Sequence, residues 1–346
     1  MASSLSVVMP MYNAARHLPR VVPPLQRAVQ SGRVREVIVV DDSSTDDGAA
    51  TCRAAGFTVL PSGGRLGPGA CRNLGVERAA GDITLFIDSD VVMHDDVPER
   101  VADAFEARDG VVALFGSYDD RPAAPGIVSR YRNLLHHFVH QSHAGEASTF
   151  WAGCGAVRTA PFRAVGGFDA ARYAQPSIED IELGYRLRRA GGTILIVPAI
   201  QGTHLKRWTF WSMVHTDIFR RALPWARLLQ QPGHGGDVLN VSNAERLKAL
   251  IAGSTLAAAI AGCFHRPFLG AAGALLAVAT LVNWPFYAVV LRAAGFVTAA
   301  AAVLLHQLYF VYGAATFLWC VVEAKLGLAP KPARDELANG KGRGDA

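Results

Sequence analysis

The stretch DITLFIDSD (82–90) decides the fold class, because a run of apolar and β-branched residues ends there in two carboxylates. Unbroken apolar runs of this length are typical of strands that are covered on both faces of a parallel sheet. A second such run, VREVIVVDD (34–42), also ends in two carboxylates. Helical stretches separate runs of this kind, so the pattern predicts an α/β domain with a parallel, doubly wound sheet.

Working outward from these two runs, we predict further strands at 5–10 and 57–61 and helices at 17–29, 45–55 and 67–80. In doubly wound sheets, ligands bind beyond the carboxyl ends of the strands. The acidic pairs Asp41/Asp42 and Asp88/Asp90 are therefore expected at one edge of one sheet.

The C-terminal part has a different composition from the rest of the chain. Residues 249–328 contain only four charged residues, although 18% of the whole chain is charged. Their charge-free stretches are 249–264, 267–291 and 293–322. A helix needs about 20 apolar residues to span a bilayer. We therefore predict two to four transmembrane spans within 248–325, followed by a polar tail over 326–346, and this excludes a fully soluble protein.

The segment RWTFWSMVHTDIFRRALPWARLL (207–229) mixes aromatic residues and leucine with arginine. This pattern predicts amphipathic helices over 208–247 that lie at the headgroup level of a membrane. The alternative is an ordinary surface helix of the globular domain.

The remaining composition bears on location and partners. The first residues, MASSLSVVMP, contain no charged region before the apolar run, so we expect no signal peptide. Five scattered cysteines suit a reducing compartment. The expected location is the inner membrane of a bacterium, with several spans and a cytoplasmic catalytic domain. A net charge of +5 is too dispersed for a nucleic-acid partner.

Three motifs of the first domain carry chemistry. Asp88 and Asp90 have the i, i+2 spacing that lets both reach one hard divalent cation, Mn²⁺ or Mg²⁺, although a solvated loop would look the same. Asp42 is placed to accept hydrogen bonds from a nucleotide or to cap the next helix. In GGRLGPGACRNLG (63–75), glycines precede a helix as in phosphate-binding loops. Arg72 there is either a phosphate clamp or a helix-surface charge.

Together these motifs resemble the nucleotide-sugar domain of family 2 glycosyltransferases, which have the GT-A fold. The resemblance runs from Ser6 to about Trp208 and rests on SVVMPMYNAARHL, VDDSSTD, ACRNLG and LFIDSDV. It implies a GT-A domain over 1–207. It also implies nucleotide-binding roles, which fall on Pro10, Tyr12, Asp42, Arg72 and Asp88.

Two further segments resemble the acceptor side of that family. FWAGCGAVRTAPFRAVGGFD (150–169) resembles its acceptor loop, and SIEDIELGYRLRRAG (177–191) resembles its catalytic segment. The resemblance makes Asp180 the general base and gives Glu179 a supporting role. A helix N-terminus is expected to keep such a carboxylate ionised, and the alternative is a plain capping role.

The segment HLKRW (204–208) resembles the family's QxxRW motif, with histidine in place of glutamine, as in some lipid glycosyltransferases. The resemblance implies that Arg207 contacts the diphosphate and that Trp208 forms an acceptor platform or a wall. His204 is then either a third metal ligand beside Asp88 and Asp90 or a core histidine.

Four histidines, His136, His137, His140 and His143, form one more cluster. The first and third share a helix face, and imidazole binds zinc well. No cysteine or acidic ligand follows at metal spacing, so an acceptor loop or a surface helix is favoured over a metal site.

These observations lead to one functional hypothesis with several alternatives. The main hypothesis is a membrane-bound, inverting, metal-dependent glycosyltransferase of the hexosyltransferase type, moving a sugar from a nucleotide sugar, by default a UDP-sugar, to a lipid or lipid-linked acceptor. The alternatives are a polyprenyl-phosphate sugar synthase, a processive polysaccharide synthase and an inactive scaffold. A nucleotide-dependent membrane oxidoreductase is opposed by the missing GxGxxG pattern.

Overall fold

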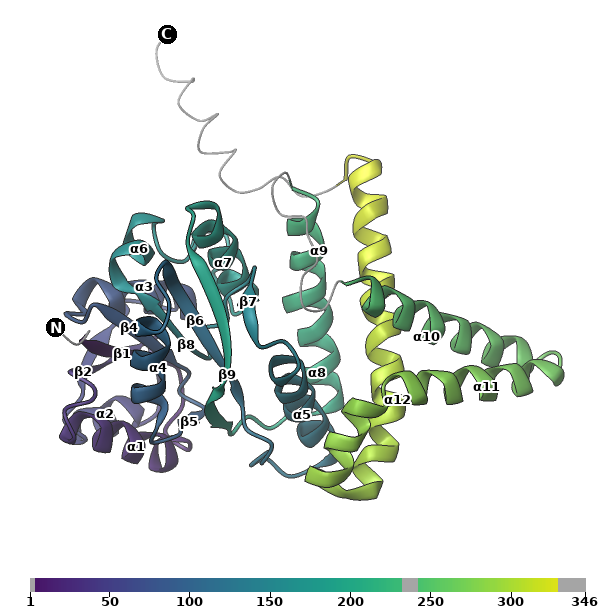
Figure 1. Cartoon of the computed structure of the whole chain (residues 1–346), viewed down its shortest axis with the longest axis horizontal. Coiled ribbons are helices and arrows are strands. Elements are labelled where there is room, and N and C mark those ends of the chain that lie inside the picture. The colour runs from purple at the N-terminus through teal and green to yellow at the C-terminus, as the bar shows by residue number, and fades with distance from the viewer. Residues whose placement is uncertain (1–3, 232–241, 329–346) are drawn as a thin grey trace, which may run out of the picture.

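The computed structural model describes residues 4–231 and 242–328, in which an α/β domain is followed by long helices (Figure 1). The strands are β1 (Leu5–Met11), β2 (Glu36–Asp41), β3 (Thr58–Pro61), β4 (Ile83–Ile87), β5 (Val91–Met93), β6 (Val111–Tyr118), β7 (Gly145–Ala147), β8 (Cys154–Arg158) and β9 (Thr193–His204). The domain's helices are α1 (Leu18–Gln30), α2 (Gly48–Ala54), α3 (Pro68–Arg78), α4 (Val97–Glu106), α5 (Ile127–Gln141), α6 (Thr159–Ala164) and α7 (Glu179–Arg189).

The sheet is mixed, with the strand order β3-β2-β1-β4-β8-β6-β9-β5 and with β7 beside β9. Strands β3, β2, β1 and β4 are parallel, as their apolar runs predict. The expectation of a wholly parallel sheet is wrong beyond β4, because β8 runs antiparallel to both β4 and β6. The antiparallel pairing of β5 with β9 sets Val91 opposite His204, and this brings the end of β9 to the acidic motif at 88–90.

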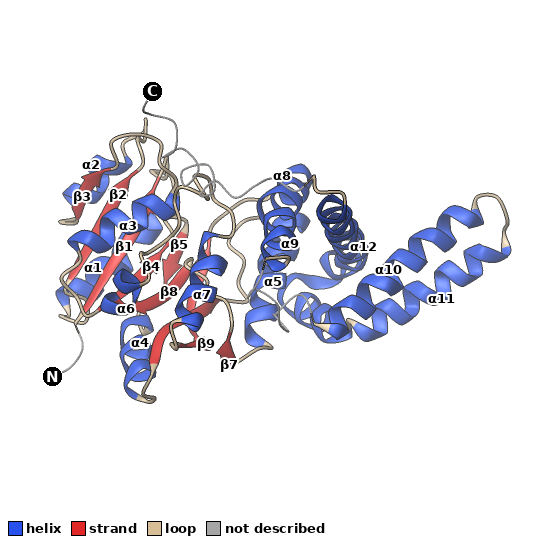
Figure 2. Ribbon diagram, turned by 90° about the horizontal axis from the view of Figure 1, so that it is seen from above, coloured by secondary structure: helices blue, strands red, loops and turns tan. Residues whose placement is uncertain are grey.

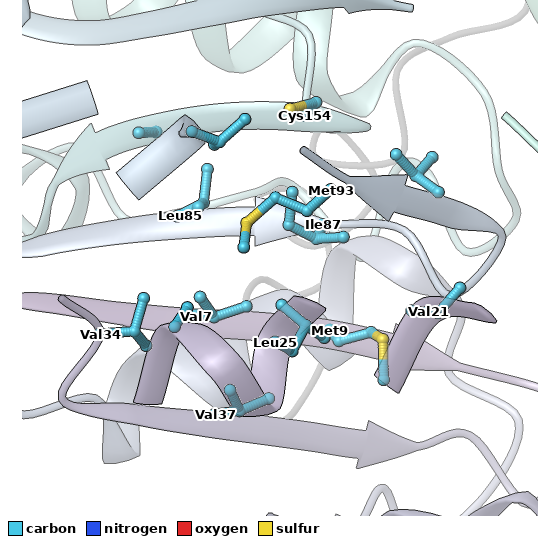
Figure 3. Packing of buried hydrophobic residues seen from close by; sticks show 14 of the residues in the cluster. Val7, Met9, Val21, Leu25, Val34, Val37, Leu85, Ile87, Met93 and Cys154 are labelled. Carbon is cyan, nitrogen blue, oxygen red and sulfur yellow. The ribbon is translucent and has the colours of Figure 1, made fainter. Parts of the chain in front are cut away.

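The core explains the unbroken apolar runs, because both faces of the sheet are covered. On one face, Val7 and Met9 of β1 pack toward Val21 and Leu25 of α1 (Figure 3). On the other face, the intervening Val8 of β1 belongs to a second buried cluster that includes residues of α3 and α7. Successive side chains of a strand point to opposite faces, so a strand buried on both sides needs apolar residues at every position.

The C-terminal helices are α8 (Phe210–His215), a π-helical stretch η1 (Thr216–Ala222), α9 (Leu223–Leu229), α10 (Asn243–Gly262), α11 (Pro267–Val282) and α12 (Trp284–Lys325). Figure 2 shows α12 beside α8 and α9, while α10 and α11 form a hairpin that projects away from the rest. Exposed apolar side chains occur on both helices of the hairpin, for example Leu250, Ile260 and Leu281.

The structure corrects the expected number of spans. Within the described residues, only α12 is both long and apolar enough to cross a membrane, and this is weak support for membrane association. The charge-free stretch 267–291 is not one helix, because α11 ends before Asn283 and α12 begins with Trp284 and Pro285. Proline lacks the backbone N–H that would continue the preceding helix. Gly295, with φ 81°, further interrupts α12.

The segment expected at the headgroup level, 207–229, is helical from Phe210 to Leu229. Its aromatic residues are partly exposed, with Trp211 at 76%. Several of its charged side chains turn inward instead: Asp217 is buried, and Arg227 pairs with Glu323 of α12 at 2.8 Å. The headgroup-level interpretation therefore fails for these two residues. Residues 232–241 of this predicted unit, and 329–346 of the predicted tail, lie outside the described residues.

Candidate active site

A cavity of about 1600 Å³ lies at the carboxyl ends of β1, β2 and β4 and reaches α10 and α12. Most of the residues that the sequence singles out line it. They are Pro10, Tyr12, Asp42, Arg72, Asp88, Asp90, Glu179, Asp180, His204 and Trp208. The expectation that the acidic pairs share one edge of the sheet holds for Asp42, Asp88 and Asp90.

Tyr12 and Asp42 sit at the β1 and β2 ends of the cavity. The Tyr12 ring is exposed, and the guanidinium of Arg65 lies 3.1 Å from its centroid. Both oxygens of Asp42 accept backbone hydrogen bonds, from Leu66 at 2.7 Å and from Gly67 at 3.0 Å. Asp42 therefore organises the glycine-rich loop rather than capping the next helix.

Gly67 lets that loop pass close to the loop before α7. Its φ is +83°, and a Cβ added there would lie 2.3 Å from the carbonyl oxygen of Ala174. Only glycine combines this backbone conformation with so close an approach. The residue thus sets the spacing between the start of α3 and the loop before α7.

Arg72 of α3 links Asp88, at the end of β4, to Glu179, at the start of α7. Its Nη2 lies 2.6 Å from Oδ1 of Asp88, and its Nη1 lies 3.3 Å from Oε1 of Glu179. The side chain is buried, so the alternative of a helix-surface charge is wrong. Glu179 also accepts a hydrogen bond from the backbone of Ser177 at 2.8 Å. These two ion pairs hold Asp88 and Glu179 in fixed positions relative to each other.

Asp90 and His204 form the second polar pair. The Nε2 of His204 lies 3.5 Å from Oδ2 of Asp90, and its Nδ1 lies 2.7 Å from Oδ1 of Asn133. An amide oxygen accepts only from a protonated nitrogen, so Nδ1 of His204 donates to Asn133. The His204 ring stacks on Tyr118, with centroids 4.2 Å apart. Burial raises the pKa of Asp90, but His204, Lys206 and His17 outweigh it and lower that pKa to about 2.

A divalent cation would fit this pair only in part. Among the described residues, no three histidine, cysteine or acidic side chains are close enough to hold a metal ion together. Asp88 is turned toward Arg72 instead. Asp90 and His204 can supply two ligands, with the His204 ring held by Asn133, and divalent cations commonly complete their shell with substrate phosphates.

Asp180 lies in the first turn of α7 and lines the cavity. Its Oδ2 accepts a hydrogen bond from the backbone of Ala152 at 3.2 Å. Burial and the neighbouring Glu179 raise the pKa of Asp180 to about 7. Burial and Glu179 thus oppose the field of the helix N-terminus, which favours the ionised carboxylate.

The HLKRW segment is placed differently from the expectation. The side chain that lines the cavity near Asp90 is that of Lys206, whereas Arg207 is exposed and does not line it. Trp208 is only 7% exposed and packs with Tyr131 and Met213, so it acts more as a wall than as an open platform. Sequence reasoning missed Lys206, although this lysine stands between His204 and Arg207 in the same motif.

Three of the four histidines, His136, His137 and His140, lie on α5, which packs between the sheet and α12 and is not a surface helix. His136 accepts a hydrogen bond from Arg221 of η1 at 2.7 Å. Burial and Arg221 hold the pKa of His136 well below its usual value, so this ring is neutral. His140 packs against Phe115 and Trp151. His136 and His140 form part of the cavity wall. Sequence reasoning missed Arg221, which lines the same cavity.

The mixed sheet, with its acidic motifs at the strand ends, defines an α/β domain of the GT-A type. Residues 6–166, just under half of the chain, match the family described as Glycosyl transferase family 2. This part of the chain is thus similar to family 2 glycosyltransferases.

Curated relatives match the chain over part of their length. Glycosyltransferase GlyG of Streptococcus pneumoniae serotype 4 is 28% identical over 127 residues, which are 35% of this chain and 42% of that protein. An uncharacterized glycosyltransferase of Haemophilus influenzae is 31% identical over 123 residues, which are 33% of this chain and 46% of that protein. The matched region thus spans less than half of either relative.

Among solved structures, the mannosyltransferase PcManGT from Pyrobaculum calidifontis, in complex with GDP-Man and Mn²⁺, has a TM-score of 0.49. It is 17% identical to this chain, and the superposition covers 92% of this chain and 88% of that one.

Proposed function

We propose that the protein is a membrane-associated, inverting glycosyltransferase that moves a sugar from a nucleotide-sugar donor to a lipid acceptor at the cytoplasmic face. The observation that carries this proposal is the cavity itself. One continuous space contains the carboxylates of both acidic motifs and also reaches the apolar helices α10 and α12. A donor pocket that opens onto apolar helices suits an acceptor that is itself apolar.

The donor half of the cavity is assigned from its contacts. Tyr12 offers an exposed ring for stacking a base, and Asp42 holds the glycine-rich loop in place before the start of α3. Asp90 and His204 would hold a divalent cation, with Asp88 nearby. When bound, such a cation neutralises charge on the diphosphate leaving group. We propose a UDP-sugar as the donor.

The acceptor half contains the proposed base. With a pKa near 7, Asp180 is ionised in a large fraction of molecules at neutral pH and still accepts a proton well. It would take the proton of the attacking hydroxyl as that oxygen reaches the anomeric carbon opposite the leaving group. Glu179 holds Arg72 and through it Asp88, so it positions rather than reacts.

The first test is donor binding by the full chain in detergent. The thermal shift would be measured with UDP-, GDP- and dTDP-sugars and CMP-sugars, each with and without Mn²⁺ or Mg²⁺. We expect stabilisation by one nucleotide family that depends on the metal and is lost in Asp90→Ala. The matched control is Asp103→Ala, an exposed aspartate on α4. Folded protein that no nucleotide stabilises would contradict the proposed function.

A further inference from the structure

The half of the cavity farthest from the nucleotide-binding loops is a largely apolar crevice, with Glu245 and Arg246 at the start of its α10 wall. Its walls include Ala249, Gly253 and Ala257 of α10, which share one helix face, and Gly313 and Phe317 of α12. A Cβ added at Gly253 or Gly313 would meet nothing within 4 Å. The crevice therefore has open width at both glycines, as a hydrocarbon chain requires.

Two arginines stand where this crevice meets the polar half. Arg220 and Arg221 of η1 both line the cavity. In the described ranges 4–231 and 242–328, neither guanidinium has a carboxylate within 4 Å, whereas Arg132 nearby pairs with Asp217 at 2.6 Å. The hydrogen bond from Arg221 goes to the neutral ring of His136. Asp217 is the carboxylate whose charge acts most on Arg221, but it is already paired with Arg132. A half-buried cation that shares its counter-charge in this way favours binding of a further anion.

The backbone around these arginines is unusual. They lie in the π-helical stretch Thr216–Ala222, inside an otherwise α-helical segment. Single π-helical turns are rare and occur frequently at functional sites. The same stretch is anchored to α12, because Tyr312 donates a hydrogen bond to Asp217 at 2.6 Å. The arginines are thus held against the helix that forms one wall of the crevice.

The anion site opens into the same cavity as the proposed base. Burial, followed by the charge of Arg132, lowers the pKa of Arg221 against the charges of Asp217 and Asp180. Asp180, Arg221 and Gly253 all line the same cavity. A ligand whose anion rests on Arg221 can therefore extend toward Asp180 on one side and into the crevice on the other.

We propose that the acceptor is a phosphate-bearing lipid whose phosphate binds Arg220 and Arg221, whose chain lies between α10 and α12, and whose free hydroxyl is the nucleophile. This inference rests on the proposed function and specifies its acceptor. A phosphate oxygen is already ionised at neutral pH and needs no base, whereas a hydroxyl does. The placement of Asp180 therefore favours a hydroxyl beside the phosphate over the phosphate oxygen itself.

The transfer step balances without a further reactant. The hydroxyl oxygen of the lipid forms a bond to the anomeric carbon. The bond from that carbon to the diphosphate breaks, and its electron pair leaves with the nucleoside diphosphate. The hydroxyl proton passes to Asp180. The lipid phosphate keeps its charge throughout and serves to hold the hydroxyl in place.

Binding of a simple lipid phosphate tests the site independently of catalysis. Thermal stabilisation of the full chain in a neutral detergent would be titrated with dodecyl phosphate, dodecanol and inorganic phosphate. We expect dodecyl phosphate to bind far more tightly than the other two. Arg221→Gln and Gly253→Leu should each weaken it at least tenfold. Arg220→Gln and Arg221→Lys serve if Arg221→Gln does not fold.

Matched controls come from outside the cavity: Arg20→Gln on α1 and Gly270→Leu on α11, both at exposed positions. They should bind dodecyl phosphate like the unchanged protein. Equal binding of inorganic phosphate would show a free-phosphate site, and equal binding of dodecanol would show an apolar site. Either result, or no stabilisation by dodecyl phosphate, would overturn the proposal. Nucleotide binding in the same samples reports separately on the proposed function.

Transfer to defined lipids then tests the nucleophile. Vesicles of phosphatidylcholine would contain phosphatidylglycerol, diacylglycerol or a polyprenyl phosphate, and labelled sugar in the lipid phase would be counted. We expect product with phosphatidylglycerol, at least tenfold more than with diacylglycerol. Product with diacylglycerol alone would overturn the phosphate site, and product with the polyprenyl phosphate alone would overturn the hydroxyl assignment.

Discussion

Arg72 and Asp88 form an ion pair with 2.6 Å between Nη2 and Oδ1, in which the arginine side chain is 5% exposed and the aspartate 32%. The other guanidinium nitrogen of Arg72 reaches Glu179, which is 107 residues away in the sequence. One buried cation thus joins the motif assigned to the donor and the motif assigned to the base. A disturbance of either carboxylate is expected to reach the other through this arginine.

Replacing Arg72 with methionine should therefore impair both stability and activity. It leaves Glu179 buried without its counter-charge, and breaking a buried pair in this way costs about 3–5 kcal/mol. We expect a large drop in melting temperature and at least a hundredfold loss of transfer. The control is Arg78→Met, an exposed arginine on the same helix. If adding Glu179→Gln to Arg72→Met restores no stability, the explanation by an unpaired carboxylate is wrong.

The rate of transfer should depend on pH through Asp180. A general base acts when it is deprotonated, so kcat/KM should rise as the pH increases through about 7 and then level off. Asp180→Asn should lower transfer by about 10²–10⁴-fold while nucleotide binding is retained. A flat profile between pH 5 and 9, or an active Asp180→Asn variant, would remove Asp180 from this role.

The same carboxylate should reduce stability at high pH. Its folded-state pKa of about 7 exceeds the ordinary value of 3.8, so the folded protein binds more protons than the unfolded chain between these values. Stability therefore falls as the pH rises from about 4 to about 7. At pH 8, Asp180→Asn should be more stable than the unchanged protein by about 2–4 kcal/mol, and at pH 4 the difference should vanish. Melting curves at the two pH values measure this.

Gly67→Ala should disturb the nucleotide-binding loop. The added Cβ meets the carbonyl oxygen of Ala174, and alanine tolerates a φ of +83° poorly. We expect a loss of about 2 kcal/mol or more in stability and at least tenfold weaker nucleotide binding, measured by thermal shift. Gly64→Ala is the matched control, since it lies in the same loop with open space around its Cβ position. Equal effects of the two variants would contradict this account.

Asn133→Ala should weaken metal activation without touching the metal. It removes the hydrogen bond that orients the His204 ring, and the loss of such a partner typically lowers metal affinity 10–100-fold. The Mn²⁺ concentration for half-maximal nucleotide binding should rise accordingly. His143→Ala, at an exposed position just beyond α5, should leave it unchanged. An unaltered Mn²⁺ requirement in Asn133→Ala would argue against His204 as a ligand.

Much of the first domain could be predicted from the sequence, because its strands are buried on both faces and end in charged residues. The runs before Asp42 and Asp90 are unambiguous for that reason. The antiparallel direction of β8 could not be predicted, since it depends on how the chain returns after β6 and α5. No local pattern in 154–158 records that path.

The site residues that sequence reasoning missed depend on tertiary structure, which no local pattern records. Which of Lys206 and Arg207 faces the cavity depends on how the chain turns between β9 and α8, and neighbouring residues point in opposite directions. The amphipathic pattern of 207–229 predicts a polar face directed at lipid headgroups, and Arg221 is part of that segment. Such a pattern identifies a polar face but not what covers it. In the fold, α5 supplies His136 to that face.

The crevice between α10 and α12 has a consequence for work with shortened proteins. A fragment that ends near residue 230 would keep the acidic motifs and lose one wall of the reaction chamber. We expect such a fragment to admit water to the anomeric carbon and to hydrolyse its donor without making product. Screens that use only residues 1–230 would then record a sugar-nucleotide hydrolase, which is the uncoupled form of the proposed reaction.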